Sequence, residues 1–159
     1  MSFRVGTGFD AHRLVEGRPL VLGGVTIEHD RGLEGHSDAD IVCHALIDAL
    51  LGASALGDIG DLFPPSDPRF AGAASIDLLA LAWQQVAAAG YRLVNCDAVL
   101  VAQAPRIAPH RAAMRARIAE ALGSEVDQVS VRATGTDGLG FMGRQEGMAC
   151  QTVVLLERV

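Results

Sequence analysis

The sequence predicts a single α/β domain in which one sheet is backed by helices on one face. Three observations predict this class. The chain has 159 residues, the usual length of one domain. Half of its residues are hydrophobic and a fifth are charged, so it can bury a core. Segments with strand patterning alternate with three segments of helical patterning, as in sheets that are covered by helices.

The first elements are expected to be a strand and a hairpin. Residues 3–9 alternate apolar and small side chains, which is the period of a strand. Short apolar runs at 20–22 and 25–27 flank a Gly-Gly pair, which is typical of a tight turn. Residues 28–37 are polar and contain glycines, so they are expected to form a loop.

The first helix is expected to begin at Asp38 behind a Ser37 cap and to end near Gly57. Aspartates in its first turn suit the positive end of the helix dipole. Residues 58–73 contain three prolines and three aspartates, which predicts a long loop. Loops of this length inside a compact domain often carry function.

The second half alternates helices with strands. Ser75 can cap a second helix, which ends at Gly90, and a long strand follows over residues 91–103. Pro105 suits the first turn of a third helix that ends at Gly123. The last strands are expected over residues 129–134 and 148–156.

Composition excludes several classes of function. All thirteen basic residues are arginine, so Schiff-base chemistry and a Walker lysine are excluded. The net charge of −6 and the lack of a basic run argue against a nucleic-acid partner. No apolar run approaches the roughly 18–20 residues that span a bilayer, and no signal peptide is seen, so no membrane partner and a cytoplasmic location are expected. Without a CxxC pair, Cys43, Cys96 and Cys150 are expected to be buried free thiols.

One group of residues suggests a metal site. Residues two apart in a strand point the same way, so Asp10 and His12 can converge. His44 lies on the first helix, with Asp40 and Asp48 one turn away on either side as candidates to hold its second ring nitrogen. Three such ligands are the usual set for zinc with one open position. The alternative is a chance Asp-x-His pair and an ordinary helix histidine.

Other polar segments carry weaker signals. Residues 35–37 precede the expected helix and could bind an anion at its N-terminus, although capping alone explains the serine. Arg106 would stand in the first turn of a helix, where a cation is unfavourable, which hints at an anionic partner. Taken alone, however, it is better interpreted as an ordinary solvated arginine. Residues 133–141 form a loop rich in glycine and threonine that suits a ligand. His29 and His110 are expected at the surface.

Six motifs, taken together, point to one family. They are Asp10-Ala11-His12, Gly35-His36-Ser37-Asp38-Ala39-Asp40, His44 to Gly52, Gly57 to Pro64, Ala102 to Arg106 and Leu139 to Arg144. In order and spacing they resemble the 2-C-methyl-D-erythritol 2,4-cyclodiphosphate synthase family over nearly the whole chain. The resemblance implies a homotrimeric cyclase of the non-mevalonate isoprenoid pathway, with active sites between subunits. Its substrate would be 4-diphosphocytidyl-2-C-methyl-D-erythritol 2-phosphate, and its products the cyclodiphosphate and CMP.

The resemblance also implies metal and catalytic residues. Asp10, His12 and His44 would bind one Zn²⁺ per subunit, and Asp137 would bind Mg²⁺ or Mn²⁺ together with the diphosphate. His36 would lie near the 2-phosphate as a candidate to stabilise the transition state. The candidate catalytic residues are His36, Thr134, Gly135 and Thr136.

The implied substrate contacts extend along the chain. Residues 58–60 and 63–67 would hold the methylerythritol part, and residues 102–108 the cytidine. Phe141 and Arg144 resemble residues near the trimer axis, where some members bind an isoprenoid diphosphate. The full set is Asp10, His12, His36, Ser37, Asp58, Ile59, Gly60, Phe63, Pro64, Pro65, Ser66, Asp67, Ala102, Gln103, Ala104, Pro105, Arg106, Ile107, Ala108, Thr134, Gly135, Thr136, Asp137, Phe141 and Arg144.

Two positions depart from the family pattern. Gly135 replaces a threonine thought to stabilise the transition state, and Thr134 or Thr136 would have to take over that role. Pro65 stands where many members have a polar or acidic residue. Two other functions therefore stay open. One is a trimeric binding protein that has lost the chemistry, and the other is a metal-dependent phosphodiesterase that uses water in place of the 2-phosphate.

Overall fold

A five-stranded mixed sheet organises the fold. The computed structural model describes all 159 residues. The strands are β1 (Phe3–Val15), β2 (Leu20–Leu22), β3 (Val25–Ile27), β4 (Gly32–Leu33), β5 (Tyr91–Val101), β6 (Val129–Thr134) and β7 (Gly147–Arg158). The main sheet has the order β4-β1-β7-β5-β6, and β2 pairs with β3 in a separate hairpin. Only β6 is parallel to its neighbour, β5.

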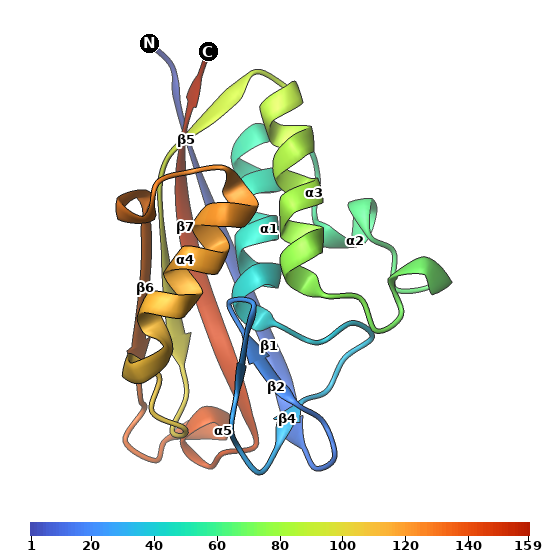
Figure 1. Cartoon of the computed structure of the whole chain (residues 1–159), viewed down its shortest axis with the longest axis vertical. Coiled ribbons are helices and arrows are strands. Elements are labelled where there is room, and N and C mark those ends of the chain that lie inside the picture. The colour runs from blue at the N-terminus through green and yellow to red at the C-terminus, as the bar shows by residue number, and fades with distance from the viewer.

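Three long helices lie on one face of this sheet, and both chain ends lie together at one end of it (Figure 1). The helices are α1 (Ile41–Ser54), α3 (Ser75–Ala88) and α4 (Arg111–Leu122). The structure is thus a single α/β domain with its sheet backed by helices, as predicted. Two further helices of one turn each are α2 (Ile59–Leu62) and α5 (Gly140–Gly143). None of the helices has the length and apolar character needed to cross a bilayer.

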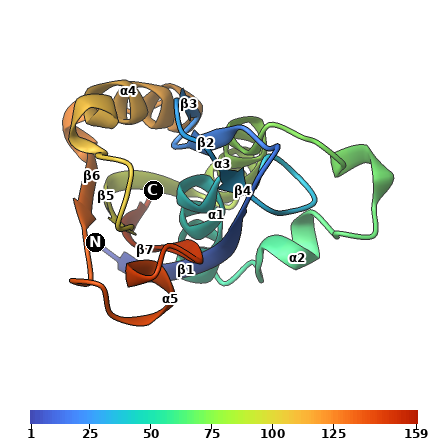
Figure 2. The same cartoon turned by 90° about the horizontal axis from the view of Figure 1, so that it is seen from below.

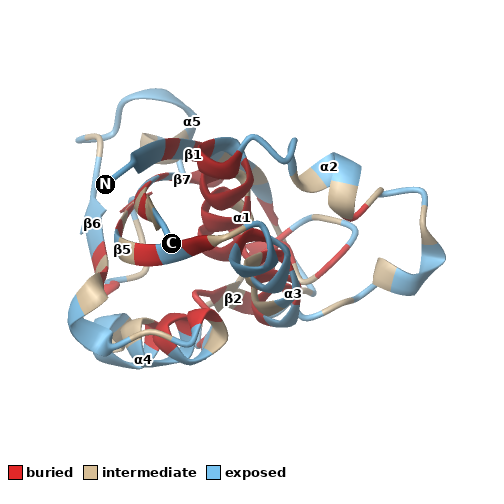
Figure 3. Cartoon of the chain, turned by 90° about the horizontal axis from the view of Figure 1, so that it is seen from above, coloured by how far each residue is buried: buried red, intermediate tan, exposed pale blue.

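Helix α1 is buried on nearly every side (Figure 3). Two glycines of β1 allow its backbone to lie directly on the strand. A Cβ atom added at Gly6 would lie 1.9 Å from the Ala49 carbonyl oxygen, and one added at Gly8 would lie 1.8 Å from that of Ala45. The Thr152 hydroxyl of β7 also donates to the Ala45 carbonyl at 2.7 Å. This close approach brings the N-terminal half of α1 against the middle of β1.

Both serines that were expected to cap helices have other roles. Helix α1 begins three residues later than predicted, and Asp40 caps it in place of Ser37 by accepting from the Val42 and Cys43 N–H groups. Asp40 is fully buried and also accepts from the glycines of the β2–β3 turn. Ser75 lies inside the first turn of α3 rather than at its cap, and the carboxylate of Asp38 accepts from its N–H.

Several boundaries also differ from the prediction. β1 continues six residues further, to Val15, because β7 pairs with it as far as Arg13. α1 ends at Ser54 rather than near Gly57, since Ala55 adopts a left-handed conformation. The third helix begins at Arg111, so the segment from Pro105 is not its first turn. The expected loop at 58–73 contains α2 and a 3₁₀ turn, while β4 and α5 were not predicted.

All three cysteines are free and buried, as predicted. Burial raises the pKa of Cys96 to about 12 and raises the pKa of Cys43 and Cys150 as well. The thiols are therefore inert core groups rather than nucleophiles.

Candidate active site

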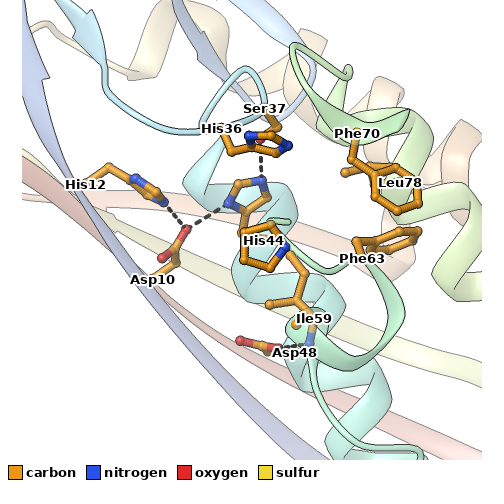
Figure 4. A pocket seen from close by; sticks show the side chains of 12 residues that line it. Asp10, His12, His36, Ser37, His44, Asp48, Ile59, Phe63, Phe70 and Leu78 are labelled. Atoms are coloured by element: carbon orange, nitrogen blue, oxygen red, sulfur yellow. Dashed lines mark hydrogen bonds and ion pairs between the residues drawn. The ribbon is translucent and has the colours of Figure 1, made fainter. Parts of the chain in front are cut away.

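Asp10, His12 and His44 converge on one point (Figure 4). Asp10 Oδ2 lies 3.0 Å from His12 Nε2 and 3.0 Å from His44 Nδ1. The first two residues come from the middle of β1 and point the same way because they are two apart in a strand. His44 comes from the first turn of α1, which the glycines of β1 bring close. The predicted cluster is confirmed.

The three groups share charge and hydrogen bonds. Burial raises the pKa of Asp10, but hydrogen bonds from His12 and His44 outweigh it, so the pKa lies below its ordinary value. The hydrogen bond with Asp10 raises the pKa of His12, and burial opposes this only in part. His12 Nδ1 donates to the Glu34 carbonyl at 2.6 Å, because a carbonyl can only accept. That bond leaves Nε2 to face Asp10.

These residues fit a metal ion. One carboxylate oxygen and two imidazole nitrogens lie within 4.8 Å of one another, and each is only partly buried. Such donors suit a transition metal with bonds of about 2.0–2.2 Å. The second ring nitrogen of each histidine has a polar partner, as is usual for metal-binding histidines. A possible metal site is therefore present.

The partner of the second His44 nitrogen is not the predicted one. His44 Nε2 lies 2.8 Å from the Ser75 hydroxyl and 3.1 Å from the Ser37 hydroxyl. Asp40 is the buried cap described above and does not contact the ring. Asp48 accepts instead from the Ile59 N–H at 2.8 Å and so anchors the start of α2. Burial raises the pKa of Asp48.

The cluster forms part of the wall of a cavity of about 340 Å³ (Figure 4). Phe63 and Phe70 stand on its far side with their rings edge to face, 5.2 Å apart. The lining comprises Asp10, His12, His36, Ser37, His44, Asp48, Ile59, Gly60, Phe63, Pro65, Phe70 and Leu78. Phe70 and Leu78 were not predicted, since no motif marks an apolar wall. Asp48 was predicted as a helix neighbour of His44, but not as a residue that lines the cavity.

A second cavity, of about 240 Å³, collects eight of the other predicted substrate residues. Its lining comprises Ala102, Gln103, Pro105, Arg106, Ile107, Ala108, Arg111, Ala133, Thr134 and Gly135. Arg111 was not predicted, and Ala133 was predicted only as the start of the ligand loop at 133–141. α2 and the segment after β5 lie on opposite sides of α1 (Figure 2), so the two cavities do not meet in one chain.

The loop at 35–37 is positioned by a side chain rather than by a helix. α1 begins at Ile41, so the loop does not form its N-terminal turn, and an anion site at residues 35–37 stays a prediction. Arg18 donates to the carbonyl oxygens of Gly35 and Ser37 at 2.9 and 2.7 Å. The His36 ring stands at the cavity, with Nε2 3.4 Å from the Asp67 carbonyl.

The remaining predicted residues lie apart from the cluster. Asp58 caps α2 and Asp67 pairs with Arg69. Arg106 precedes α4 instead of lying in its first turn. Asp137 adopts a left-handed loop conformation outside the metal cluster. Pro64, Ser66 and Ala104 line neither of these two cavities, and neither do Thr136, Phe141 and Arg144.

Two histidines differ from their expected exposure. His29 is half-buried, with its Nε2 3.2 Å from Asp30, and His110 is half-buried at the start of α4. Neither belongs to the metal cluster.

Comparison with known proteins agrees with the resemblance in the motifs. A protein from Moorella thermoacetica named 2-C-methyl-D-erythritol 2,4-cyclodiphosphate synthase is 62% identical over 153 residues, which are 96% of this chain and 94% of the relative. The bifunctional IspDF from Campylobacter jejuni has a TM-score of 0.96 at 43% identity, covering 99% of this chain and 43% of that longer one.

A third match is a solved 2C-methyl-D-erythritol-2,4-cyclodiphosphate synthase in a CDP-bound form. It has a TM-score of 0.89 at 40% identity, covering 97% of this chain and 100% of that one. The family model that matches spans residues 3–157. This chain belongs to the YgbB family.

Proposed function

We propose that this chain converts 4-diphosphocytidyl-2-C-methyl-D-erythritol 2-phosphate into 2-C-methyl-D-erythritol 2,4-cyclodiphosphate and CMP. The observation that carries this proposal is the convergence of Asp10, His12 and His44 at the wall of a substrate-sized cavity. The relative from Moorella thermoacetica bears the name of this synthase at 62% identity. The enzyme is a lyase of the non-mevalonate isoprenoid pathway.

The reaction is an internal phosphoryl transfer. An oxygen of the 2-phosphate forms a bond to the β-phosphorus, the bond from that phosphorus to the bridging oxygen breaks, and CMP leaves with the electron pair. The 2-phosphate is the nucleophile, so no strong protein base is needed. Asp10, His12 and His44 would hold a divalent ion, which would supply positive charge beside the diphosphate when bound. The chain contributes positioning and charge stabilisation, which dominate phosphoryl transfer.

The side chains of the larger cavity divide the work of binding. His36 and Ser37 stand beside the metal cluster and can donate to the 2-phosphate. Phe63, Phe70 and Leu78 form an apolar wall that suits the methylerythritol carbons and excludes water. Hydrolysis by water is the competing reaction, so this exclusion favours ring closure.

Zinc is the ion that best suits the cluster. Two imidazole nitrogens and one carboxylate oxygen would make up three ligands of a zinc ion, whose Lewis acidity would act on a phosphate oxygen of the substrate. The side chain of Asp137 offers a carboxylate that suits Mg²⁺ or Mn²⁺ with the diphosphate. Because Asp137 lies outside the cluster of its own chain, it would reach the site from a neighbouring subunit.

A homotrimer would unite the two cavities. The cavity around residues 102–108 fits the cytidine part, and a relative of this fold is known in a CDP-bound form. It would complete the metal cavity of the next subunit. The open face of the sheet supports this assembly, since Val5 and Phe9 are 66% and 62% exposed there.

The same assembly would create a site near the trimer axis. Phe141 borders a small cavity with Ala11 and Arg13, and together with Arg144 it would face the trimer axis, where an isoprenoid diphosphate could bind.

Three free buried thiols support a reducing compartment, so we place the enzyme in the cytoplasm.

Incubation with authentic substrate tests the function. The purified chain with zinc and Mg²⁺ should release CMP and a product with the mass of the cyclodiphosphate, and His44→Ala should not. A linear phosphate product would favour the phosphodiesterase. Absence of any product would favour the binding protein. That alternative is tested because Gly135 replaces a threonine of the family pattern.

A further inference from the structure

His44 uses its two ring nitrogens for different contacts. Nδ1 lies 3.0 Å from Asp10 Oδ2, within the metal cluster. Nε2 lies 2.8 Å from the Ser75 hydroxyl, outside that cluster. A contact of this second kind fixes the tautomer and orientation of a metal-binding histidine. The partner here is a serine, which can either donate or accept, so its own hydrogen bond decides the outcome.

Asp38 decides the direction of that bond. The Ser75 hydroxyl is hydrogen-bonded to Asp38 Oδ1, and an ionised carboxylate can only accept. The single hydroxyl proton of Ser75 therefore points to Asp38. The Ser75 oxygen therefore faces His44 as an acceptor at 2.8 Å, which favours a proton on Nε2. The Ser37 hydroxyl is the more distant neighbour of Nε2, at 3.1 Å, and it also lies 3.2 Å from the Ser75 oxygen, to which it can donate. The nitrogen that would bind a metal ion is then Nδ1, which in the metal-free chain is hydrogen-bonded to Asp10.

The carboxylate of Asp38 is itself held firmly. Its Oδ2 accepts from the Ser75 N–H at 3.1 Å, and its Oδ1 accepts from the Asp40 N–H at 3.1 Å. Ser75 is 0% exposed, so water does not compete for its hydroxyl. Neither Asp38 nor Ser75 lines the cavity. Ser75 contacts two side chains that line the cavity, the His44 ring at 2.8 Å and the Ser37 hydroxyl at 3.2 Å, and of these only His44 belongs to the metal cluster.

We propose that Asp38 and Ser75 form a relay that holds the Nε2-protonated tautomer of His44 and so presents Nδ1 to the metal ion. Both are positioning residues, because they touch neither the ion nor the substrate. The relay rests on the proposed metal site. A purely structural role, in which Asp38 only caps the start of α3, is the competing explanation.

Zinc affinity of the purified full-length chain separates these explanations, measured by competition with a chelator and with zinc as the only probe. Ser75→Ala removes the hydroxyl but keeps the N–H bond to Asp38. Asp38→Asn keeps the size and an acceptor for that N–H, and provides a second test should Ser75→Ala not fold. Ser54→Ala is the matched control, since it removes a buried hydroxyl that bonds only within α1, to Leu50 and Leu51.

We expect Ser75→Ala to bind zinc about 10- to 100-fold more weakly and Asp38→Asn about tenfold more weakly. Ser54→Ala should keep the zinc affinity of wild type, while its melting temperature should fall about as much as that of Ser75→Ala. In the zinc-loaded chain, the His44 Nε2 proton should exchange with solvent faster in Ser75→Ala than in wild type or in Ser54→Ala, as seen by NMR.

Two results would overturn the relay. If both relay variants bind zinc like wild type while His44→Ala does not, the relay is wrong and the metal site stands. If His44→Ala also keeps full zinc affinity, the metal site and the relay fall together.

Discussion

Asp10 Oδ2 and His44 Nδ1 lie 3.0 Å apart although 34 positions separate the two residues in the chain. Their meeting depends on Gly8, which lets α1 rest on β1 with Ala45 against the strand. The geometry of the metal cluster is therefore set by the packing of one helix on one strand, and it can be disturbed without altering any ligand.

Gly8→Ala should damage both stability and metal binding. The new Cβ would meet the Ala45 carbonyl oxygen at 1.8 Å, so α1 must move away from β1. We expect a loss of about 2–3 kcal/mol in the free energy of unfolding by urea. Gly52→Ala is the control, because nothing lies within 4 Å of its added Cβ and alanine favours the helix. Equal stability of the two variants would show that α1 does not need this contact.

In the metal-free chain, the Asp10–His12 pair should stabilise the folded state most at mildly acidic pH. The lowered pKa of Asp10 gives a contribution that is present above pH 3.8 and is lost as pH falls through the lowered value. The raised pKa of His12 gives one that is full below pH 6.5 and is lost as pH rises through the raised value. The melting temperature of wild type should therefore be higher than that of Asp10→Asn, and the difference should be largest between pH 3.8 and pH 6.5.

A matched carboxylate shows whether that window belongs to the histidine. The pKa of Asp97 is lowered chiefly by its hydrogen bond with Arg132, which keeps its charge in alkali. The difference between wild type and Asp97→Asn should thus persist at pH 9. An Asp10→Asn difference that also persists undiminished at pH 9 would contradict the account of the Asp10–His12 pair.

Thr134 is better placed than Thr136 to replace the threonine missing at Gly135. Thr136 donates its hydroxyl to the Leu139 carbonyl at 2.6 Å, whereas Thr134 makes only a longer bond, of 3.2 Å, to the Gly135 carbonyl and lines the second cavity. We expect Thr134→Ala to lower kcat by about 10²-fold with little change in KM, as for a contact made mainly in the transition state. Thr136→Ala should have the smaller effect on kcat.

Gly135→Thr provides the complementary test by steady-state CMP release. An added Cβ would lie 3.7 Å from Gln103 Oε1 and 3.9 Å from the Ala102 carbonyl, which are ordinary contacts, so the fold should tolerate the change. If neither alanine variant slows turnover while Gly135→Thr speeds it greatly, Thr134 does not compensate.

The open face of the sheet should hold the trimer together. Light scattering should give a mass three times that of the 16.6 kDa chain. Val5→Asp places a charge on the exposed apolar face of β1 and should produce monomers. Leu81→Asp changes an exposed leucine of α3, away from that face, and should remain trimeric. A 16.6 kDa wild-type species at micromolar concentration would contradict the assembly.

The sequence predicted those features that local rules determine. The two-residue period of a strand brought Asp10 and His12 together, and the helical position of His44 completed the metal cluster. The motifs identified most residues of both cavities, but they did not predict that the two cavities lie apart within one chain. That separation depends on where the segments after β5 and around α2 lie relative to α1, which no local pattern encodes.

The capping predictions were wrong because two aspartates supplied the partners, one adjacent to its helix and one distant in the chain. Ser37 and Ser75 satisfy the local preference for a cap, yet Asp40 caps α1 while also binding the N–H groups of the β2–β3 turn. The cap of α3 comes from Asp38, 37 positions away. Such tertiary partners override intrinsic capping preference, and the same rearrangement frees both serine hydroxyls for His44.

The central claim is that the substrate's own phosphate, and not water, attacks the diphosphate at this metal site. Turnover in water enriched in ¹⁸O, with mass spectrometry of both products, tests it most directly. Ring closure predicts unlabelled CMP and an unlabelled cyclodiphosphate, because every oxygen of the new bond comes from the substrate. One ¹⁸O atom in CMP or in a linear phosphate product would show hydrolysis and would contradict the account.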